Sequence, residues 1–140
     1  MNKYKQLRDK HSKEFNEFPI FFAFNEKQFE EGMAKLNLKR SDIQKVYKLS
    51  DTGGFYRKSD AAMLKELFKR HDHEMAEAMQ DDDFLYDMFS YELANHEYAY
   101  SYDLFPVLEA CGLTYDDIKE NPRLADALKN AQVDYLEISR

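Results

Sequence analysis

The chain has 140 residues, of which 44% are hydrophobic and 34% charged, and this is enough apolar material for the core of one domain over residues 1–140. The single cysteine excludes an internal disulfide framework and fits a reducing cytoplasm, and the few Gly and Pro argue against disorder. No apolar stretch approaches the length of a membrane span, and the N-terminus MNKYKQLRDKHSKEF lacks the apolar core of a secretory signal. We therefore expect a cytoplasmic protein without a membrane partner.

The net charge of −7 conceals an asymmetry between the two halves. Residues 1–70 carry 16 Lys and Arg against 10 Asp and Glu, whereas residues 71–140 carry 4 against 17. No lysine or arginine lies between Arg70 and Lys119. Because this acidic segment repels phosphates, we expect no direct binding of nucleic acid through it.

The first part of the chain alternates helix and strand signals. Asn25 suits the N-cap of a helix, and the glycines of the run Asp51–Gly54 can supply the positive φ that a hairpin turn needs. The aromatic run FPIFFAF is typical of a buried strand. The predicted elements are a helix over about 2–16, a strand over Ile20–Phe24, a helix over Glu26–Leu36, a short helix within Asn37–Lys45 and a hairpin within Val46–Lys58.

From Ser59 onward only helices are expected. Ser59 is a natural N-cap, the carboxylates of QDDD suit the first turn of a helix, and Gly112 marks a helix end. The predicted helices cover about 60–79, Asp83–Tyr102, Leu104–Cys111, Tyr115–Glu120 and a last segment from Pro122. The predicted fold class is α+β, with a small antiparallel β-sheet of about three strands in the N-terminal half packed on a C-terminal helical bundle.

Three ionisable side chains are expected to meet between two of these helices. If helices 60–79 and 83–102 form an antiparallel hairpin, His71 lies opposite the region of Glu92, and His96 shares the helix face of Glu92. One interpretation is structural, since a carboxylate on an apolar face needs a hydrogen-bond partner. In the other, His71, Glu92 and His96 bind Zn²⁺ or another divalent ion. The spacing matches no metalloenzyme motif, so no catalytic residue and no other cofactor is predicted.

Residues 84–105 carry more aromatic side chains than one helix face can bury. Some of the tyrosines are therefore expected at the surface beside carboxylates. Such a surface suits a basic protein partner, because tyrosine is enriched at binding hot spots; it also fits a merely solvated acidic face. The predicted partner-binding residues are Asp81, Asp82, Asp83, Tyr86, Asp87, Glu97 and Tyr98.

Neither a nucleophile nor a phosphate loop is recognisable. Cys111 lies on an apolar stripe before Gly112, which indicates a buried filler and not a reactive thiolate. The run DTGGF lacks the Lys-Ser/Thr that follows in a phosphate loop. We expect no enzymatic activity.

Three segments carry a family resemblance: PIFFAFNEKQFEEGMAKLNL, YKLSDTGGFYRKSD and DDDFLYDMFSYELANHEYAYSYD. Over about residues 15–120 the chain resembles an uncharacterised family of small bacterial proteins that are often encoded near phages and conjugative elements. That family has no established activity, so no functional residue is carried over from it. The resemblance implies a mobile-element context, in which small acidic proteins often inhibit host defence nucleases, anti-CRISPR proteins among them.

Two functions follow as expectations. The leading one is a protein-binding module, a mobile-element inhibitor of a host nucleic-acid-handling defence protein that acts through the acidic, tyrosine-rich helical face. The alternative is a metal-binding protein with a His/Glu site between two helices, structural or hydrolytic.

Overall fold

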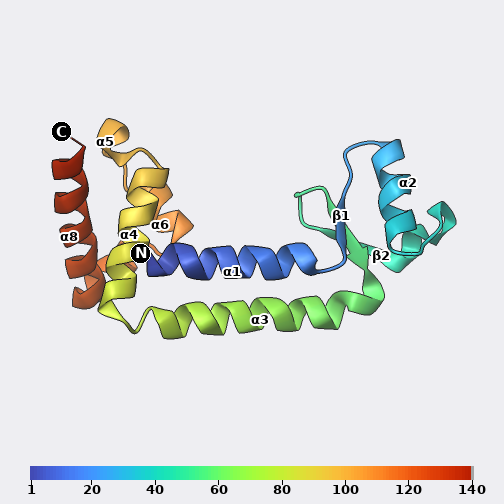
Figure 1. Cartoon of the computed structure of the whole chain (residues 1–140), viewed down its shortest axis with the longest axis horizontal. Coiled ribbons are helices and arrows are strands. Elements are labelled where there is room, and N and C mark those ends of the chain that lie inside the picture. The colour runs from blue at the N-terminus through green and yellow to red at the C-terminus, as the bar shows by residue number, and fades with distance from the viewer. Residues whose placement is uncertain (140) are drawn as a thin grey trace. The chain divides into compact units, whose positions relative to one another are not determined.

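The computed structural model describes residues 1–139 and confirms the α+β class, with a small antiparallel sheet in the N-terminal half and a group of helices in the C-terminal half (Figure 1). The chain forms two compact units. Unit 1 contains Met1–Lys10 and the chain from His73 onward, and unit 2 contains His11–Asp72. The boundary falls inside α1 (Lys3–Glu17) and inside α3 (Ala61–Ala78), so each of these helices contributes residues to both units. The expectation of a single domain stays a prediction.

Unit 2 is built on a three-stranded antiparallel sheet. Its strands are β1 (Ile20–Phe22), β2 (Val46–Leu49) and β3 (Gly54–Arg57), in the order β1-β3-β2. The predicted hairpin therefore pairs β2 with β3, and β1 adds to the free edge of β3. Three helices accompany the sheet: α2 (Glu26–Lys35) and the 3₁₀ helices η1 (Arg40–Lys45) and η2 (Lys58–Asp60).

Helix α2 packs closely on β1, and the residues at this contact explain why. Asn25 caps the helix as predicted, because its side chain accepts a hydrogen bond from the backbone N–H of Gln28 at 2.8 Å. A Cβ on Gly32 would lie 1.9 Å from Cδ1 of Phe21, so only glycine lets the Phe21 ring approach the helix so closely. The buried core of unit 2 consists of Phe21, Met33, Leu36 and Val46.

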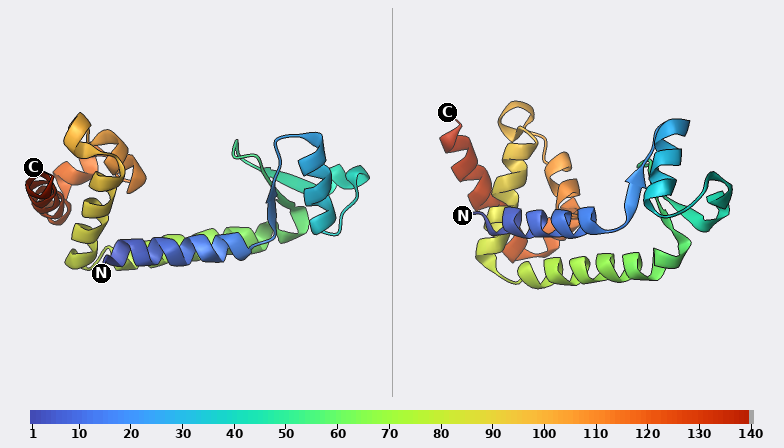
Figure 2. Two further views of the ribbon diagram at one scale, coloured as in Figure 1. Left: turned by 45° about the horizontal axis from the view of Figure 1, so that its top comes forward. Right: turned by 45° about the vertical axis from the view of Figure 1, so that its right-hand side comes forward.

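Unit 1 is helical, and its main contact is between two long helices that lie side by side in Figures 1 and 2. These are α4 (Asp82–Asn95) and α8 (Pro122–Ile138); the shorter helices are α5 (Tyr98–Ser101), α6 (Phe105–Ala110) and α7 (Tyr115–Glu120). The partner on which α4 packs is thus α8, and not the preceding helix that the sequence interpretation had assumed. Fully enclosed apolar side chains fill the centre of this unit, among them Leu85, Phe89, Leu93, Val107 and Ala131.

The prediction of one continuous helix over Asp83–Tyr102 is wrong. Helix α4 ends at Asn95, and Glu97 adopts a left-handed conformation with φ of 49° before α5 begins. Tyr102 closes α5 with a second left-handed φ of 53°. A residue with positive φ interrupts the helical hydrogen-bond ladder and turns the following side chains to new directions. The face assigned to residues beyond Asn95 by helical spacing is therefore not the face that they occupy.

In unit 2, the last turns of α1 lie beside the first half of α3. Phe15 stacks on Phe68 with ring centroids 5.9 Å apart, and His11 stacks on His71 at 3.9 Å. Rings that face each other at this spacing hold the two helix segments in a defined register. Among residues 1–139, the structure has no helix with the length and apolar character needed to cross a bilayer.

Candidate functional site

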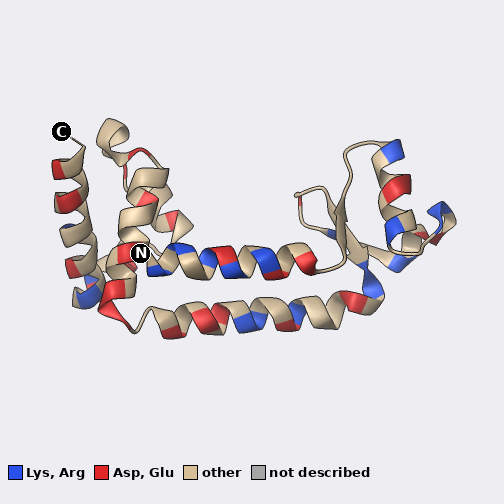
Figure 3. Cartoon of the chain, viewed as in Figure 1, with Lys and Arg blue, Asp and Glu red and all other residues tan. Residues whose placement is uncertain are grey.

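A groove of about 330 Å³ lies between α4 and α8 in unit 1, and it contains three of the predicted partner-binding residues. Its lining is largely polar and includes three carboxylates and one basic residue; it consists of Asp82, Asp83, Tyr86, Arg123, Asp126, Ala127 and Asn130. Acidic positions occur on both helices that form it, as Figure 3 shows. The acidic, tyrosine-containing face predicted on one helix thus continues onto a second helix that the prediction did not include.

Asp82 and Arg123 form an ion pair inside this groove. Arg123 Nη2 lies 2.7 Å from Asp82 Oδ1, and the same guanidinium donates to the carbonyls of Met79 and Gln80 at 3.3 and 2.9 Å. The guanidinium of Arg123 is therefore occupied by Asp82 and by the carbonyls of the turn before α4. Asp83, whose side chain is 85% exposed, keeps its carboxylate at the groove surface, where Lys3 Nζ approaches its Oδ2 at 3.8 Å.

Tyr86 donates a hydrogen bond from its hydroxyl to Asp134 Oδ2 on α8, with an O···O distance of 2.6 Å. This bond, together with partial burial, raises the pKa of Tyr86 above its ordinary value. The phenol stays a neutral donor that is held across the groove, and its ring offers apolar contact area beside the carboxylates.

Asp81 and Asp87 have structural partners in the first residues of the chain. Asp81 caps α4 by accepting from the backbone N–H of Asp83 at 3.0 Å, and Lys3 Nζ lies 2.8 Å from its other oxygen. The hydrogen bond from Lys3 holds the pKa of Asp81 below its usual value. Asp87 accepts from the backbone N–H of Lys3 at 2.8 Å, and its carbonyl accepts from Asn2. Both carboxylates therefore hold the start of α1 on α4.

The prediction that Tyr98 is exposed is wrong. Its side chain is 7% exposed, its hydroxyl accepts from Gln132 at 3.0 Å, and its ring packs against Tyr102. The break at Glu97 is the cause, because it turns Tyr98 inward and leaves Tyr100 outward with 88% exposure. Glu97 itself is exposed.

Glu92 is buried in the core of unit 1 at 1% exposure and is hydrogen-bonded. Its Oε2 accepts from the Tyr4 hydroxyl at 2.6 Å, and its Oε1 accepts from Asn95 at 3.1 Å. Arg8 Nη1 lies 3.6 Å away, and His96 Nε2 lies 3.9 Å from Oε1. A buried carboxylate needs such partners, so the geometry supports the structural interpretation of Glu92, with Tyr4 as its main partner. Burial, and next this bond, raise the pKa of Tyr4.

The predicted triad is divided between the two units. Glu92 and His96 are neighbours in unit 1, whereas His71 belongs to unit 2 and there contacts His11 and Glu14. The imidazoles of His71 and His11 stack with an interplanar angle of 14°, and His71 Nε2 lies 3.4 Å from Glu14 Oε1. Burial lowers the pKa of His71, and the neighbouring His11 lowers it further.

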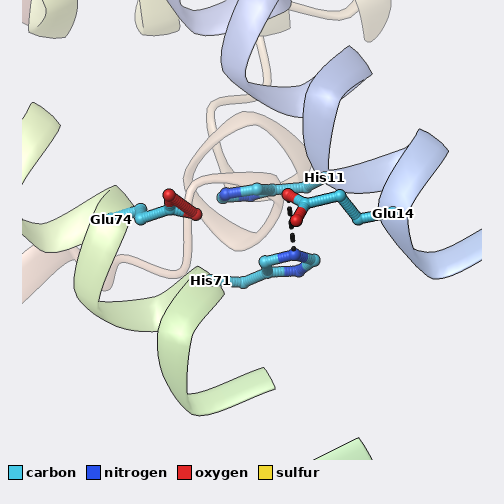
Figure 4. A group of neighbouring side chains, drawn as sticks. All are labelled: His11, Glu14, His71 and Glu74. Carbon is cyan, nitrogen blue, oxygen red and sulfur yellow. Dashed lines mark ion pairs between the residues drawn. The ribbon is translucent and has the colours of Figure 1, made fainter. Parts of the chain in front are cut away.

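His11, Glu14 and His71 form a group that can hold a metal ion, because each offers a ligand atom and these atoms lie within 4.8 Å of one another. Figure 4 shows them together with Glu74, which follows His71 by one turn of α3. The sequence interpretation missed His11 and Glu14. The signal that could have found them is a repeated spacing, His-x-x-Glu, at residues 11–14 and again at 71–74.

Comparison with known proteins identifies a family and nothing more specific. Neither a curated protein nor a solved structure matches the chain. A family model, described as a family of unknown function (DUF7659), matches residues 3–134. This match confirms the resemblance to an uncharacterised family, while the association with phages and conjugative elements stays a prediction. Because the match covers nearly the whole sequence, the chain belongs to DUF7659, a family of unknown function.

Proposed function

We propose that this chain is a protein-binding module whose acidic groove between α4 and α8 receives basic side chains of a protein partner. The composition of the groove is the observation that supports this most. Asp83 and Asp126 are exposed in its lining, and Tyr86 lies beside them. Arg123, the basic residue of the lining, is paired with Asp82, and Lys3 pairs with Asp81 at 2.8 Å and approaches Asp83 at 3.8 Å. A lysine or arginine of a partner gains charge-assisted hydrogen bonds there and packs its aliphatic stem on the tyrosine ring.

The charge of the unit that carries the groove favours the same kind of partner. Unit 1 has 8 Lys and Arg against 17 Asp and Glu, a net charge of −9, whereas unit 2 has 12 against 10. A field of this sign raises the association rate with basic proteins and repels phosphates. The groove is accordingly proposed as a protein site and not as a nucleic-acid site.

The class of partner follows from charge and from the family resemblance together. Proteins that handle nucleic acids carry basic grooves for phosphates, and an acidic groove is complementary to such surfaces. We therefore extend the proposal to a mobile-element inhibitor, anti-CRISPR-like in its mode of action, that occupies the basic surface of a host defence protein in the cytoplasm. The association with mobile elements supports this extension only by analogy.

Charge reversal at the groove tests the proposal. The double variant D83K/D126K reverses two exposed groove carboxylates while leaving the Asp82–Arg123 pair and the Tyr86–Asp134 bond in place. The control is D116K/E120K, which reverses two exposed carboxylates on α7 outside the groove lining and gives the same net charge.

We expect affinity purification from host cells, followed by binding assays with the purified partner, to show a loss of at least about tenfold for D83K/D126K. The α7 control should bind as the unmodified chain does, and the two variants should lose a similar, small amount of thermal stability, because each reverses one carboxylate in the first turn of a helix. A partner that binds D83K/D126K with unchanged affinity would rule out the groove as the binding surface. If both double variants bind the partner with equally reduced affinity, the effect comes from net charge and not from the groove, which would also contradict the proposal.

A further inference from the structure

Two helix segments carry matching His-x-x-Glu spacings, at residues 11–14 and at residues 71–74. His11 and Glu14 lie one turn apart on α1, and His71 lies one turn before Glu74 on α3. Residues three apart on a helix share a face, so each segment offers an imidazole and a carboxylate side by side. In Figure 4 these side chains point toward one another from the two helices.

We propose that His11, Glu14 and His71, all in unit 2, bind a divalent transition-metal ion, with Zn²⁺ as the best-fitting ion and a water molecule in the fourth position. This site is independent of the proposed groove, because its three ligands belong to unit 2 and the groove belongs to unit 1. It also differs from the predicted His71–Glu92–His96 set in every ligand except His71.

The distances fit the coordination geometry of zinc. Metal–ligand bonds of about 2.1 Å in a tetrahedron place neighbouring ligand atoms about 3.4 Å apart. His71 Nε2 and Glu14 Oε1 already lie 3.4 Å apart. The group as a whole lies within 4.8 Å, so small side-chain rotations are enough to bring every ligand atom to bonding distance. Two imidazoles and one carboxylate are nitrogen and oxygen donors of the kind that zinc takes, and imidazole suits zinc well.

Arg70 supplies the outer contact that orients a ligating carboxylate. Its Nη2 lies 2.6 Å from Glu14 Oε2, which leaves Oε1 directed at His71. Carboxylates that bind metals are commonly hydrogen-bonded in this way by a second residue. One turn away on each helix, the stack of Phe15 on Phe68 holds the two segments together.

The metal-free alternative is a structural cluster of stacked imidazoles and carboxylates. It leaves one buried group weakly paired: His71 Nε2 makes no well-formed hydrogen bond with any of residues 1–139, and its contact with Glu14 Oε1 is 3.4 Å long. A metal ion bonded to both atoms satisfies this nitrogen more fully than the long ion pair does. None of the three proposed ligands belongs to the apolar core of unit 2.

The four histidines of the chain provide matched controls. His11 and His71 are proposed ligands, whereas His73 pairs with Glu77 and His96 lies near Glu92. Zn²⁺ would be titrated by calorimetry into the untagged full-length chain after treatment with a chelator. The set comprises the unmodified chain, H11A, H71A, E14Q, H73A and H96A, each checked for folding by circular dichroism.

We expect one Zn²⁺ per chain, with affinity at least about 100-fold weaker in H11A and H71A and unchanged in H73A and H96A. E14Q keeps the shape of the side chain and should also weaken Zn²⁺ binding. If an alanine variant fails to fold, the affinity of E14Q for Zn²⁺ therefore tests the proposed site. Co²⁺ in the same chain should show the strong visible absorption of a tetrahedral site. The proposal is overturned if no stoichiometric binding occurs, if H73A or H96A abolishes it, or if all variants bind alike, which would indicate adventitious zinc only.

Discussion

The substitution Tyr4→Phe removes a single hydrogen bond from the core of unit 1. Tyr4 is 3% exposed, and its hydroxyl donates to the buried Glu92 at 2.6 Å. Its ring packs against Phe84 and Tyr91, with centroids 5.9 and 5.6 Å away. Phenylalanine keeps these ring contacts, so the change in the free energy of unfolding reports the bond to the carboxylate and little else.

We expect Tyr4→Phe to cost about 2–3 kcal/mol, because a buried carboxylate loses its shortest hydrogen bond and keeps only Asn95 and the more distant Arg8 near it. The control is Tyr86→Phe, which removes a bond of the same 2.6 Å length to the exposed Asp134. Water replaces that bond, so the control should cost no more than about 0.5–1 kcal/mol.

Urea unfolding followed by far-ultraviolet circular dichroism measures both variants. The shift in midpoint gives the change in stability, provided that the slope with urea concentration stays constant. A cost below about 0.5 kcal/mol for Tyr4→Phe, or an equal cost for the two variants, would refute the role assigned to the Tyr4–Glu92 bond.

Three further predictions concern packing, reactivity and capping. Gly32→Ala should destabilise unit 2 by about 1–3 kcal/mol in urea unfolding, because the new Cβ would lie 1.9 Å from Phe21 Cδ1 and the ring must move; an unchanged midpoint would contradict this packing. Burial raises the pKa of the Cys111 thiol to about 12, so at pH 8 a thiol reagent should react at least about 100-fold more slowly with the folded chain than with the chain in urea. Similar rates in the two states would mean that the thiol is not buried as described. Asn121→Ala should cost about 1 kcal/mol by removing the side chain that accepts from the N–H groups of Arg123 and Leu124 at the start of α8, whereas Asn121→Asp should be nearly neutral; thermal unfolding of both variants checks this.

Local signals in the sequence predicted most elements correctly because each depends on short-range chemistry. Asn25 caps α2 with the expected side-chain bond to the backbone, and Thr114 caps α7 with a bond of the same kind. Gly112 follows α6 with a φ of 70°, and the two glycines near residue 53 lie in the β2–β3 hairpin. Caps and turns of this kind need no tertiary information.

The errors arose where tertiary structure decides. Helix α4 ends at Asn95, and Glu97 then adopts a left-handed conformation. Because glycine is the usual residue in this conformation and none is present here, nothing in the sequence indicated the break. The helical spacing was therefore extended beyond Asn95, and it placed Tyr98 at the surface. The choice of α8 as the main partner of α4 also depends on packing across distant segments, which periodicity on one helix does not specify. Val133 shows the same limit, since its apolar character within the last helix predicts an inward side chain, whereas the side chain is 49% exposed.

The candidate sites were predictable in part for related reasons. Asp82, Asp83 and Tyr86 are close in sequence and share the first turns of α4, so local reasoning found them, whereas Asp126 and Asp134 come from α8 and were missed. The carboxylate of Glu92 was correctly expected to need a partner, but the partner is Tyr4, which lies 88 residues away. A pairing over such a separation leaves no periodic signal.

Amide hydrogen exchange on the full-length chain, with and without a partner captured by affinity purification, tests the acidic groove most directly. The proposal predicts that the partner slows exchange in the first turns of α4, over Asp82–Tyr86, and in the groove segment of α8, over Arg123–Asn130. D83K/D126K should lose this protection. Protection confined to unit 2 or to α6 and α7, with none in the two groove segments, would contradict the claim that the groove is the binding surface.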